Sequence, residues 1–188
     1  MGRWEPDARG RLVQSALELY AEKGFDETTA IEVAERAGVT ERTFFRHFAD
    51  KREVLFQASR DLQDGVVAAI AAAPADLPVV EVGVRAMVSV ASVLEDNRPH
   101  SVRRALVIAS NASLQERELL KLSSLGAAVS TALRERGTPQ LVADLAAETA
   151  VTSFKIGFEL WISDDKPGTF AECIALAFDQ LKALTAGH

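Results

Sequence analysis

The sequence predicts an all-α protein, and three observations support this fold class. No stretch of the 188 residues shows the convincing alternation of apolar and polar side chains that a half-buried strand requires. The six prolines fall at breaks between segments with helical spacing, and proline is disfavoured inside helices. Thr29 and Glu32 have the Ser/Thr-x-x-Glu spacing of a helix-starting capping box. We therefore expect an N-terminal helix-turn-helix domain of three helices followed by a C-terminal helical domain, with about nine helices in the chain.

The expected helices are separated by short connections. The first three lie near residues 6–23, 30–37 and 41–47. The fourth, near 51–73, is expected to run without a break from the N-terminal domain into the C-terminal one, so that a shift of this helix would reorient the N-terminal domain. The remaining helices are expected near 78–96, 99–110, 113–136, 139–163 and 168–186.

Residues 28–51 predict two short helices joined by a tight turn. The first helix starts at the capping box and ends before Gly38, where the left-handed backbone of a helix end favours glycine. Thr40 is a suitable N-cap for the second helix. That helix should bury Phe44 and Phe48, four residues apart, and turn its arginine, threonine and histidine side chains outward. A short capped helix with such a face suits the major groove of DNA.

Charge is unevenly distributed along the chain. The whole chain carries a formal net charge of −6, and residues 1–56 hold nine Lys or Arg against eleven Asp or Glu. From Arg36 to Arg52, five Lys or Arg stand against two acidic residues, a net charge of +3. This local positive charge can attract phosphates within a screening length of roughly 8 Å. The acidic remainder should oppose non-specific binding to DNA.

Several residues occur in a fixed order along the N-terminal part of the chain. Leu12, Ala16, Tyr20, Gly24 and Phe25 are followed by the strings TTAIEVAERAGVT and TFFRHFADKREVL. Their spacing resembles that of the DNA-binding domain of the TetR (tetracycline-repressor-like) family of transcriptional regulators, and the last string resembles the family's Thr-Leu-Tyr-x-His-Phe-x-x-Lys signature. The resemblance implies a DNA-binding domain at residues 1–50 and a ligand-sensing and dimerisation domain at 51–188.

The resemblance also implies a set of DNA contacts, although which side chains touch bases is left open. Phe45 stands where the family has a tyrosine, so the hydroxyl contact with a phosphate should be lost or become apolar. His47 can alternatively be a helix-end residue favoured by the dipole, and Lys51 a solvated helix start. Arg36 lies near a helix C-terminus, where a cation is favourable without DNA. The implied contact residues are Thr29, Thr40, Arg42, Thr43, Phe45, Arg46, His47 and Lys51.

The expected helix near 139–163 is apolar around most of its circumference, with one narrow polar stripe. A helix that packs on one surface shows a single apolar face. This helix is therefore either the centre of the subunit's own bundle or part of an interface between two copies. The resemblance favours the interface, because the family dimerises through its last two helices and a dimer suits a palindromic operator. The candidate interface residues are Leu145, Ile156, Gly157, Leu160, Ile174, Phe178 and Leu181.

The resemblance implies a cavity for a small molecule among the helices that precede residue 163. Arg103 and Arg104 are adjacent, so at most one can face inward, and an inward arginine would suit an anionic group. The side chains expected to line this cavity are mostly apolar, which suggests a hydrophobic effector of unknown identity. Ordinary core packing is the alternative for most of them. The candidate lining residues are Met87, Val90, Leu94, Arg103, Leu106, Val107, Leu122, Leu125, Phe154 and Phe158.

Other function classes find little support in the sequence. There is no phosphate-binding glycine loop, no catalytic serine setting and no pair of soft ligands with metal-site spacing, so neither an enzyme, a cofactor nor a metal site is expected. The single cysteine, Cys173, fits a reducing cytosol. No run spans a bilayer and no secretory signal is found, which argues against a membrane partner.

The predicted function is a ligand-responsive, DNA-binding transcriptional repressor. It should bind a palindromic operator in double-stranded DNA as a homodimer in the cytoplasm, and a hydrophobic small molecule should release it. A transcriptional activator and a helical protein-interaction module on the same fold are the alternatives.

Overall fold

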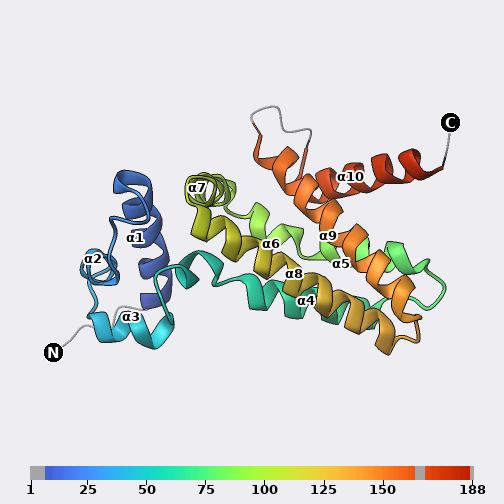
Figure 1. Cartoon of the computed structure of the whole chain (residues 1–188), viewed down its shortest axis with the longest axis horizontal. Helices are drawn as coiled ribbons and strands as arrows, with labels where there is room; N and C mark the ends of the chain where they lie inside the picture. Colours follow the sequence, from blue (N-terminus) through green and yellow to red (C-terminus); the bar gives the residue numbers. More distant parts are fainter. Residues whose placement is uncertain (1–6, 164–167, 187–188) are drawn as a thin grey trace. The chain divides into compact units, whose positions relative to one another are not determined.

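The computed structural model describes residues 7–163 and 168–186, and every regular element in these ranges is a helix (Figure 1). The all-α fold class predicted from the sequence is confirmed. The start expected for the first helix near residue 6 lies outside the described residues. Contacts within the chain divide it into two compact units. Unit 1 consists of Met1–Gln57 and Val102–Glu118, and unit 2 of Ala58–Ser101 and Leu119–His188.

Unit 1 combines the N-terminal helices with a corner from the middle of the chain. Residues 102–118 form this corner, which contains the end of α7 (Arg98–Ala109) and the start of α8 (Ala112–Glu135). The other elements of unit 1 are α1 (Ala8–Lys23), α2 (Ala30–Arg36), α3 (Glu41–His47) and the short 3-10 helix η1 (Glu53–Phe56).

The corner shares the hydrophobic core of unit 1. Leu12 of α1 and Phe44 of α3 are fully buried in this core, and Val107, Ile108 and Leu114 of the corner are buried in the same cluster. Burying each such side chain contributes roughly 1.5–3 kcal/mol. The corner is therefore part of the folded unit 1, although the sequence predicted a division at residue 50. The assignment of DNA binding to residues 1–50 and of ligand sensing and dimerisation to residues 51–188 stays a prediction.

Charged side chains also attach the corner to η1. Arg104 donates from Nε to the carbonyl oxygen of Leu55 at 2.7 Å and forms an ion pair of 3.0 Å with Glu118. Arg117 donates from Nε to the Glu53 carboxylate at 2.6 Å. Hydrogen bonds that involve ionised groups are roughly twice as strong as neutral ones, so these contacts add directional restraint to the apolar packing.

Unit 2 is a helical bundle in which α9 (Gln140–Ile162) packs against α5 (Val79–Ser89) and α10 (Phe170–Thr185). Small side chains allow the α5–α9 contact: a Cβ added at Gly83 of α5 would lie 3.2 Å from the Cβ of Ala150 in α9. The remaining elements of unit 2 are α4 (Ser59–Ala72), α6 (Ala91–Glu95) and the other parts of α7 and α8.

The helix expected near 51–73 is divided, which corrects the prediction of an unbroken connection. The structure has η1 at Glu53–Phe56 and starts α4 at Ser59. The Asp50 carboxylate caps η1 by accepting from the amides of Arg52 and Glu53 at 2.8 and 3.1 Å. The three residues that follow Glu53 are all buried, so this turn lies inside the core of unit 1 rather than on one face of a longer helix.

The helix expected near 78–96 is divided at Val90 into α5 and α6. The Ser89 hydroxyl donates to the carbonyl oxygen of Ala86 at 2.7 Å. That oxygen would otherwise accept from the Val90 amide, which instead bonds to Met87 at 3.3 Å. Serine hydroxyls compete in this way with the helical hydrogen bonds of the backbone, so the break has a local cause.

Gly157 of α9 lies directly against the backbone of α10 in the same chain. A Cβ added there would be 2.7 Å from both the Cα and the amide nitrogen of Ile174. Backbone atoms cannot move aside as a flexible side chain can. The close approach of α9 and α10 therefore depends on the absence of a side chain at this position.

We predict that Gly157→Ala lowers the free energy of unfolding by roughly 1–3 kcal/mol, the usual cost of overpacking. Gly126→Ala in α8 is the matched control, because its Cβ would meet the Glu148 side chain at an ordinary 3.5 Å. That control should be neutral or stabilising by up to about 1 kcal/mol, since alanine favours helix. Urea unfolding measures both, and equal stability of the two variants would contradict the close approach.

Candidate nucleic-acid interface

The turn between α2 and α3 is held by side-chain caps at both helix starts. The Thr29 hydroxyl accepts from the Glu32 amide at 3.2 Å, and the Glu32 carboxylate accepts from the Thr29 amide at 2.8 Å, which forms the predicted capping box. Gly38 in the turn has φ of +69°, a left-handed value that favours glycine. Bonds from Lys23 and Thr29 hold the pKa of Glu32 at about 2. The cap thus contributes stability above the ordinary carboxyl range and loses it as the pH falls towards 2.

Thr40 caps α3 as predicted. Its hydroxyl accepts from the Thr43 amide at 3.2 Å and lies 3.0 Å from the Thr43 hydroxyl. Each of the two hydroxyl groups therefore has a partner within the protein. The cap fixes the first turn of α3, where the outward side chains begin.

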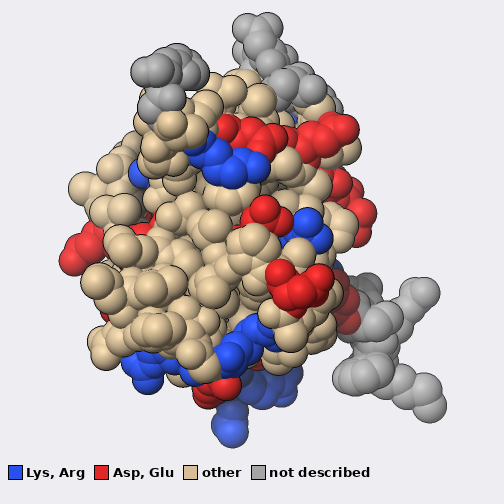
Figure 2. Space-filling view, turned by 90° about the vertical axis from the view of Figure 1, so that its right-hand side faces the viewer, with Lys and Arg blue, Asp and Glu red and all other residues tan. Residues whose placement is uncertain are grey.

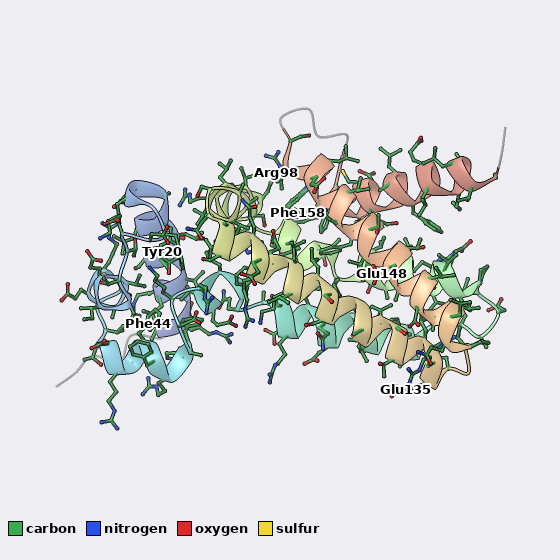
Figure 3. The ribbon with its side chains drawn as sticks, in the orientation of Figure 1. Tyr20, Phe44, Arg98, Glu135, Glu148 and Phe158 are labelled. Atoms are coloured by element: carbon green, nitrogen blue, oxygen red, sulfur yellow. The ribbon has the colours of Figure 1, made fainter. Side chains whose placement is uncertain are left out.

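α3 has one buried and one exposed face. Phe44 is fully buried and Phe48 is 4% exposed, whereas Arg42, Phe45 and Arg46 are exposed. No side chain among the described residues forms an ion pair with Arg42 or Arg46. Figure 3 shows Phe44 directed among the helices of unit 1. The two faces are those that the spacing of the phenylalanines predicted.

Lys51 lies where the sequence did not place it. Its ammonium group donates to the carbonyl oxygens of Phe25 and Thr28, each at 2.8 Å, and of Asp26 at 3.2 Å. It also lies 4.3 Å from the centre of the Phe25 ring. All three of its hydrogens are thus engaged by the loop between α1 and α2. Neither a solvated helix start nor a freely projecting phosphate ligand describes this side chain.

The backbone at Lys51 is held from the other side by Tyr20. The Tyr20 hydroxyl donates to the Lys51 carbonyl oxygen at 2.7 Å, and burial raises the pKa of Tyr20. Figure 3 shows Tyr20 within unit 1. A buried tyrosine hydroxyl requires such a partner, so Tyr20 and Lys51 together fix the segment that follows α3.

The net charge of +3 counted from Arg36 to Arg52 overstates the free positive charge. Arg36 forms an ion pair of 2.7 Å with Glu22, whose pKa it lowers by hydrogen bonding. Arg52 forms an ion pair of 3.0 Å with Asp50, whose negative charge the count of +3 already includes. Lys51 keeps its charge but donates to carbonyl oxygens, so Arg42 and Arg46 are the arginines of this segment that form no ion pair within the described residues.

His47 is half-buried at the end of α3. Its Nε2 atom is buried and has no hydrogen-bond partner among the described residues. An unpaired buried polar atom costs roughly 1–3 kcal/mol. Its predicted contact with a phosphate stays a prediction, and so does that of Thr29.

The candidate effector residues divide between the two units. Met87, Val90, Leu125 and Phe154 belong to the core of unit 2. Leu94, Leu122 and Phe158 pack against that core.

Three other candidates lie outside the core of unit 2, and their contact with an effector stays a prediction. Val107 is in the core of unit 1, and Arg103 and Leu106 are exposed. The inward face of α7 in unit 1 is carried by Arg104, Val107 and Ile108, one residue further round the helix than predicted. The spacing of apolar residues in the sequence fits the predicted face and the observed face equally well. It therefore could not show which of the two faces is buried.

The candidate dimer residues also divide. Leu145 and Ile156 of α9 are 62% and 43% exposed, as an interface between copies requires. Leu160 and Leu181 are half-buried. The remaining three are buried in the core of their own subunit, and their part in an interface stays a prediction: Gly157, Ile174 and Phe178.

A groove of about 430 Å³ lies between the starts of α5 and α9. Figure 2 shows a broad area without charged side chains on the face where α5 begins and α10 ends. None of the candidate effector residues lines the groove. Its lining residues are Val79, Val80, Val142, Leu145, Ala146 and Thr149.

Two family models match the chain. Residues 12–58 match the model of bacterial regulatory proteins of the tetR family. Residues 77–186 match a TetR C-terminal model, the MftR C-terminal domain. The chain belongs to the TetR family of transcriptional regulators. The first match contains α2, α3 and Lys51, and the second contains α5, α9 and α10.

Curated transcriptional regulators are similar to part of this chain. The HTH-type transcriptional regulator TcmR of Streptomyces glaucescens is 40% identical over 67 residues, which are 36% of this chain and 30% of TcmR. The HTH-type transcriptional repressor KstR2 of Mycobacterium tuberculosis is 33% identical over 60 residues, 32% of this chain and 30% of KstR2. The matched segment thus spans about a third of the length of these relatives.

Several solved structures share the fold over nearly the whole chain. A regulator from Syntrophomonas wolfei has a TM-score of 0.66 at 20% identity and covers 96% of both chains. FadR of Bacillus subtilis, solved with stearoyl-CoA, has a TM-score of 0.62 at 16% identity and covers 95% of this chain and 99% of FadR. SmeT, solved with triclosan, has a TM-score of 0.65 at 17% identity, over 94% and 90%.

The described residues contain neither a membrane-spanning helix nor a cluster of metal ligands. Within 7–163 and 168–186, no helix combines the length and the apolar character that crossing a membrane requires. The same residues contain no group of three or more His, Cys, Asp or Glu that could hold a metal ion.

We predict that Lys51→Met lowers the free energy of unfolding by roughly 1.5–3 kcal/mol, because it removes a charged donor and leaves the loop carbonyls unpaired. Arg52→Met is the control, since Arg52 is an exposed partner in a surface ion pair worth about 0–1 kcal/mol. Urea unfolding of both variants tests this. Equal losses would mean that the Lys51 bonds do not stabilise unit 1.

Proposed function

We propose that the chain is a DNA-binding transcriptional repressor that acts as a homodimer and is released by a hydrophobic small molecule. The observation that carries this proposal is α3, a capped helix that exposes Arg42 and Arg46, neither of which forms an ion pair with another described residue. The family consists of transcriptional regulators, and we propose a cytoplasmic regulator without enzymatic activity.

The chemistry of α3 favours DNA over a protein partner. Guanidinium groups bond to guanine O6 and N7 in the major groove and to phosphates along its edges. A protein-binding helix would be expected to expose a larger apolar surface at its centre. Here the two arginines flank Phe45, the one large apolar side chain that α3 exposes.

Dimerisation is supported by apolar side chains that α9 leaves exposed. Leu141, Leu145 and Ile156 lie on α9, and Leu176 and Leu184 lie on α10. Leu141 and Leu145 are one turn apart, and Ile156 lies about three turns further along the same side, with the exposed Glu148 and Thr152 between them. Exposed apolar side chains that gather on one side of a helix favour an interaction site. Two copies joined through these helices would present two α3 helices to an inverted repeat.

An apolar effector is supported by the composition of the unit 2 core. The candidate side chains Met87, Leu125, Phe154 and Phe158 cluster there, and the Phe154 and Phe158 rings both lie edge-on to Phe170, at 5.1 and 5.6 Å between centroids. Related structures were solved with stearoyl-CoA and triclosan, which both carry large apolar groups. We propose a ligand of the same chemical character, without choosing between a fatty acyl thioester and an aromatic compound.

Selection of bound DNA from a random pool tests the proposal. A homodimeric repressor should return an inverted repeat, and adding the correct hydrophobic compound should lower the affinity for it. Failure to enrich any sequence at low salt would favour the protein-interaction module instead.

We predict that Arg42→Ala or Arg46→Ala weakens binding to the selected operator by roughly 1–3 kcal/mol if the residue reads a base. Arg134→Ala is the control, because it removes the same charge from an exposed position on α8. Mobility-shift titrations at two salt concentrations separate base contacts from phosphate contacts, since only phosphate contacts change the salt slope. Unchanged binding by both α3 variants would refute the assignment.

We predict that Leu145→Lys converts the dimer into monomers, because it places a charge in the proposed apolar interface. Leu119→Lys is the matched control, since Leu119 of α8 is also 62% exposed. Sedimentation of both variants over a range of concentrations measures the association. A dimer that survives Leu145→Lys and dissociates with Leu119→Lys would place the interface on α8.

A further inference from the structure

Phe45 is a large apolar side chain at the centre of the exposed face of α3. It is 50% exposed, although α3 buries its neighbour Phe44 completely. The two rings meet edge to face, with centroids 5.3 Å apart and planes at 80°. This contact restrains the Phe45 ring, so that its exposed edge is presented in a defined direction rather than moving freely.

A phenylalanine ring can make only apolar contacts with DNA. It has neither a donor nor an acceptor, so it gains nothing from a phosphate oxygen. Of the base edges in the major groove, thymine alone carries an apolar group, the C5-methyl. A ring that enters the groove between two arginines therefore has one favourable partner among the four bases.

The position of Phe45 along α3 also restricts where this partner lies. Arg42 is one turn earlier on the same exposed face, about 4.5 Å along the helix axis. Successive base pairs are about 3.4 Å apart. When α3 lies along the groove, the base that Phe45 meets is within one or two base pairs of the one that Arg42 meets.

We propose that Phe45 determines operator specificity by reading the C5-methyl group of one thymine in each half-site. This inference rests on the proposed function, and it adds a base-reading residue whose contact is apolar. It also accounts for an exposed phenylalanine on a helix that otherwise exposes charged side chains. The arginines supply hydrogen bonds, and Phe45 supplies discrimination that does not depend on charge.

Replacing thymine by deoxyuracil removes the methyl group and leaves base pairing intact, so it tests the contact directly. The selected operator is synthesised with one such replacement at a time, symmetrically in both half-sites. Each duplex is titrated with the wild-type protein, with Phe45→Ala and with Ile31→Ala. Ile31 of α2 is the control, because it is an apolar side chain of unit 1 with similar exposure, 47%.

One thymine in each half-site should stand out. Losing its methyl group should weaken wild-type binding by roughly fourfold for each half-site, the value of one buried methyl-sized group. The same replacement should not affect Phe45→Ala, whereas Ile31→Ala should respond like the wild type. Thermal unfolding should show that Phe45→Ala is folded, since an exposed side chain contributes little to the core.

Two results would overturn the inference. If methyl removal weakens the wild type and Phe45→Ala equally at every thymine, another residue reads the methyl groups. If no replacement matters and Phe45→Ala still lowers affinity, the ring contacts sugar rather than a base. In both cases operator binding itself persists, so the proposed function survives. Absence of any selected operator would instead overturn the proposed function together with this inference.

Discussion

The folded arrangement of unit 1 depends on one ammonium group. Lys51 donates to three carbonyl oxygens in residues 25–28, while Tyr20 donates to the carbonyl of Lys51 itself. These bonds join the loop before α2 to the segment after α3. The helix-turn-helix is thereby closed at both ends, and α3 cannot pivot on Phe44 and Phe48 without breaking charged hydrogen bonds. A small domain has a limited core, so such polar closure carries more weight here than it would in a larger one.

This closure has an electrostatic consequence for recognition. Lys51 cannot fill its three carbonyl bonds and also project freely to a phosphate. Arg36 and Arg52 are matched by Glu22 and Asp50. The segment that looked strongly basic in the sequence therefore offers mainly the guanidinium groups of α3. Each phosphate contact contributes about 0.9 to the salt slope of DNA affinity, so binding by this face should be less sensitive to salt than its composition suggests.

The sequence predicted features that depend on neighbouring residues. The capping box at Thr29, the cap at Thr40 and the burial of Phe44 and Phe48 follow from spacing within one or two turns, and all are present. Features that depend on distant partners were missed. Nothing near Lys51 in the sequence indicates the carbonyls of residues 25–28. On α7, the faces carrying Leu106 and Ile108 are equally apolar, and only the core of unit 1 decides which one is buried.

The helix α9 shows how far an apolar pattern can be interpreted. Its two apolar sides were correctly recognised, yet pattern alone could not assign each side to its partner. Gly157 decides the matter, because its missing side chain lets α10 of the same chain approach to backbone contact. The side of α9 that contains Phe154 is buried within the subunit, whereas Leu145 and Ile156 remain exposed. The close packing within one subunit therefore defines the surface that remains for a second copy. Under the proposed function one α3 presents two guanidinium groups to DNA, and two linked copies would bind the second half-site at a high effective concentration. The packing at Gly157, which leaves apolar side chains of α9 exposed, and the bonding of Lys51, which leaves few cations for phosphates, are both consistent with the proposed dimer.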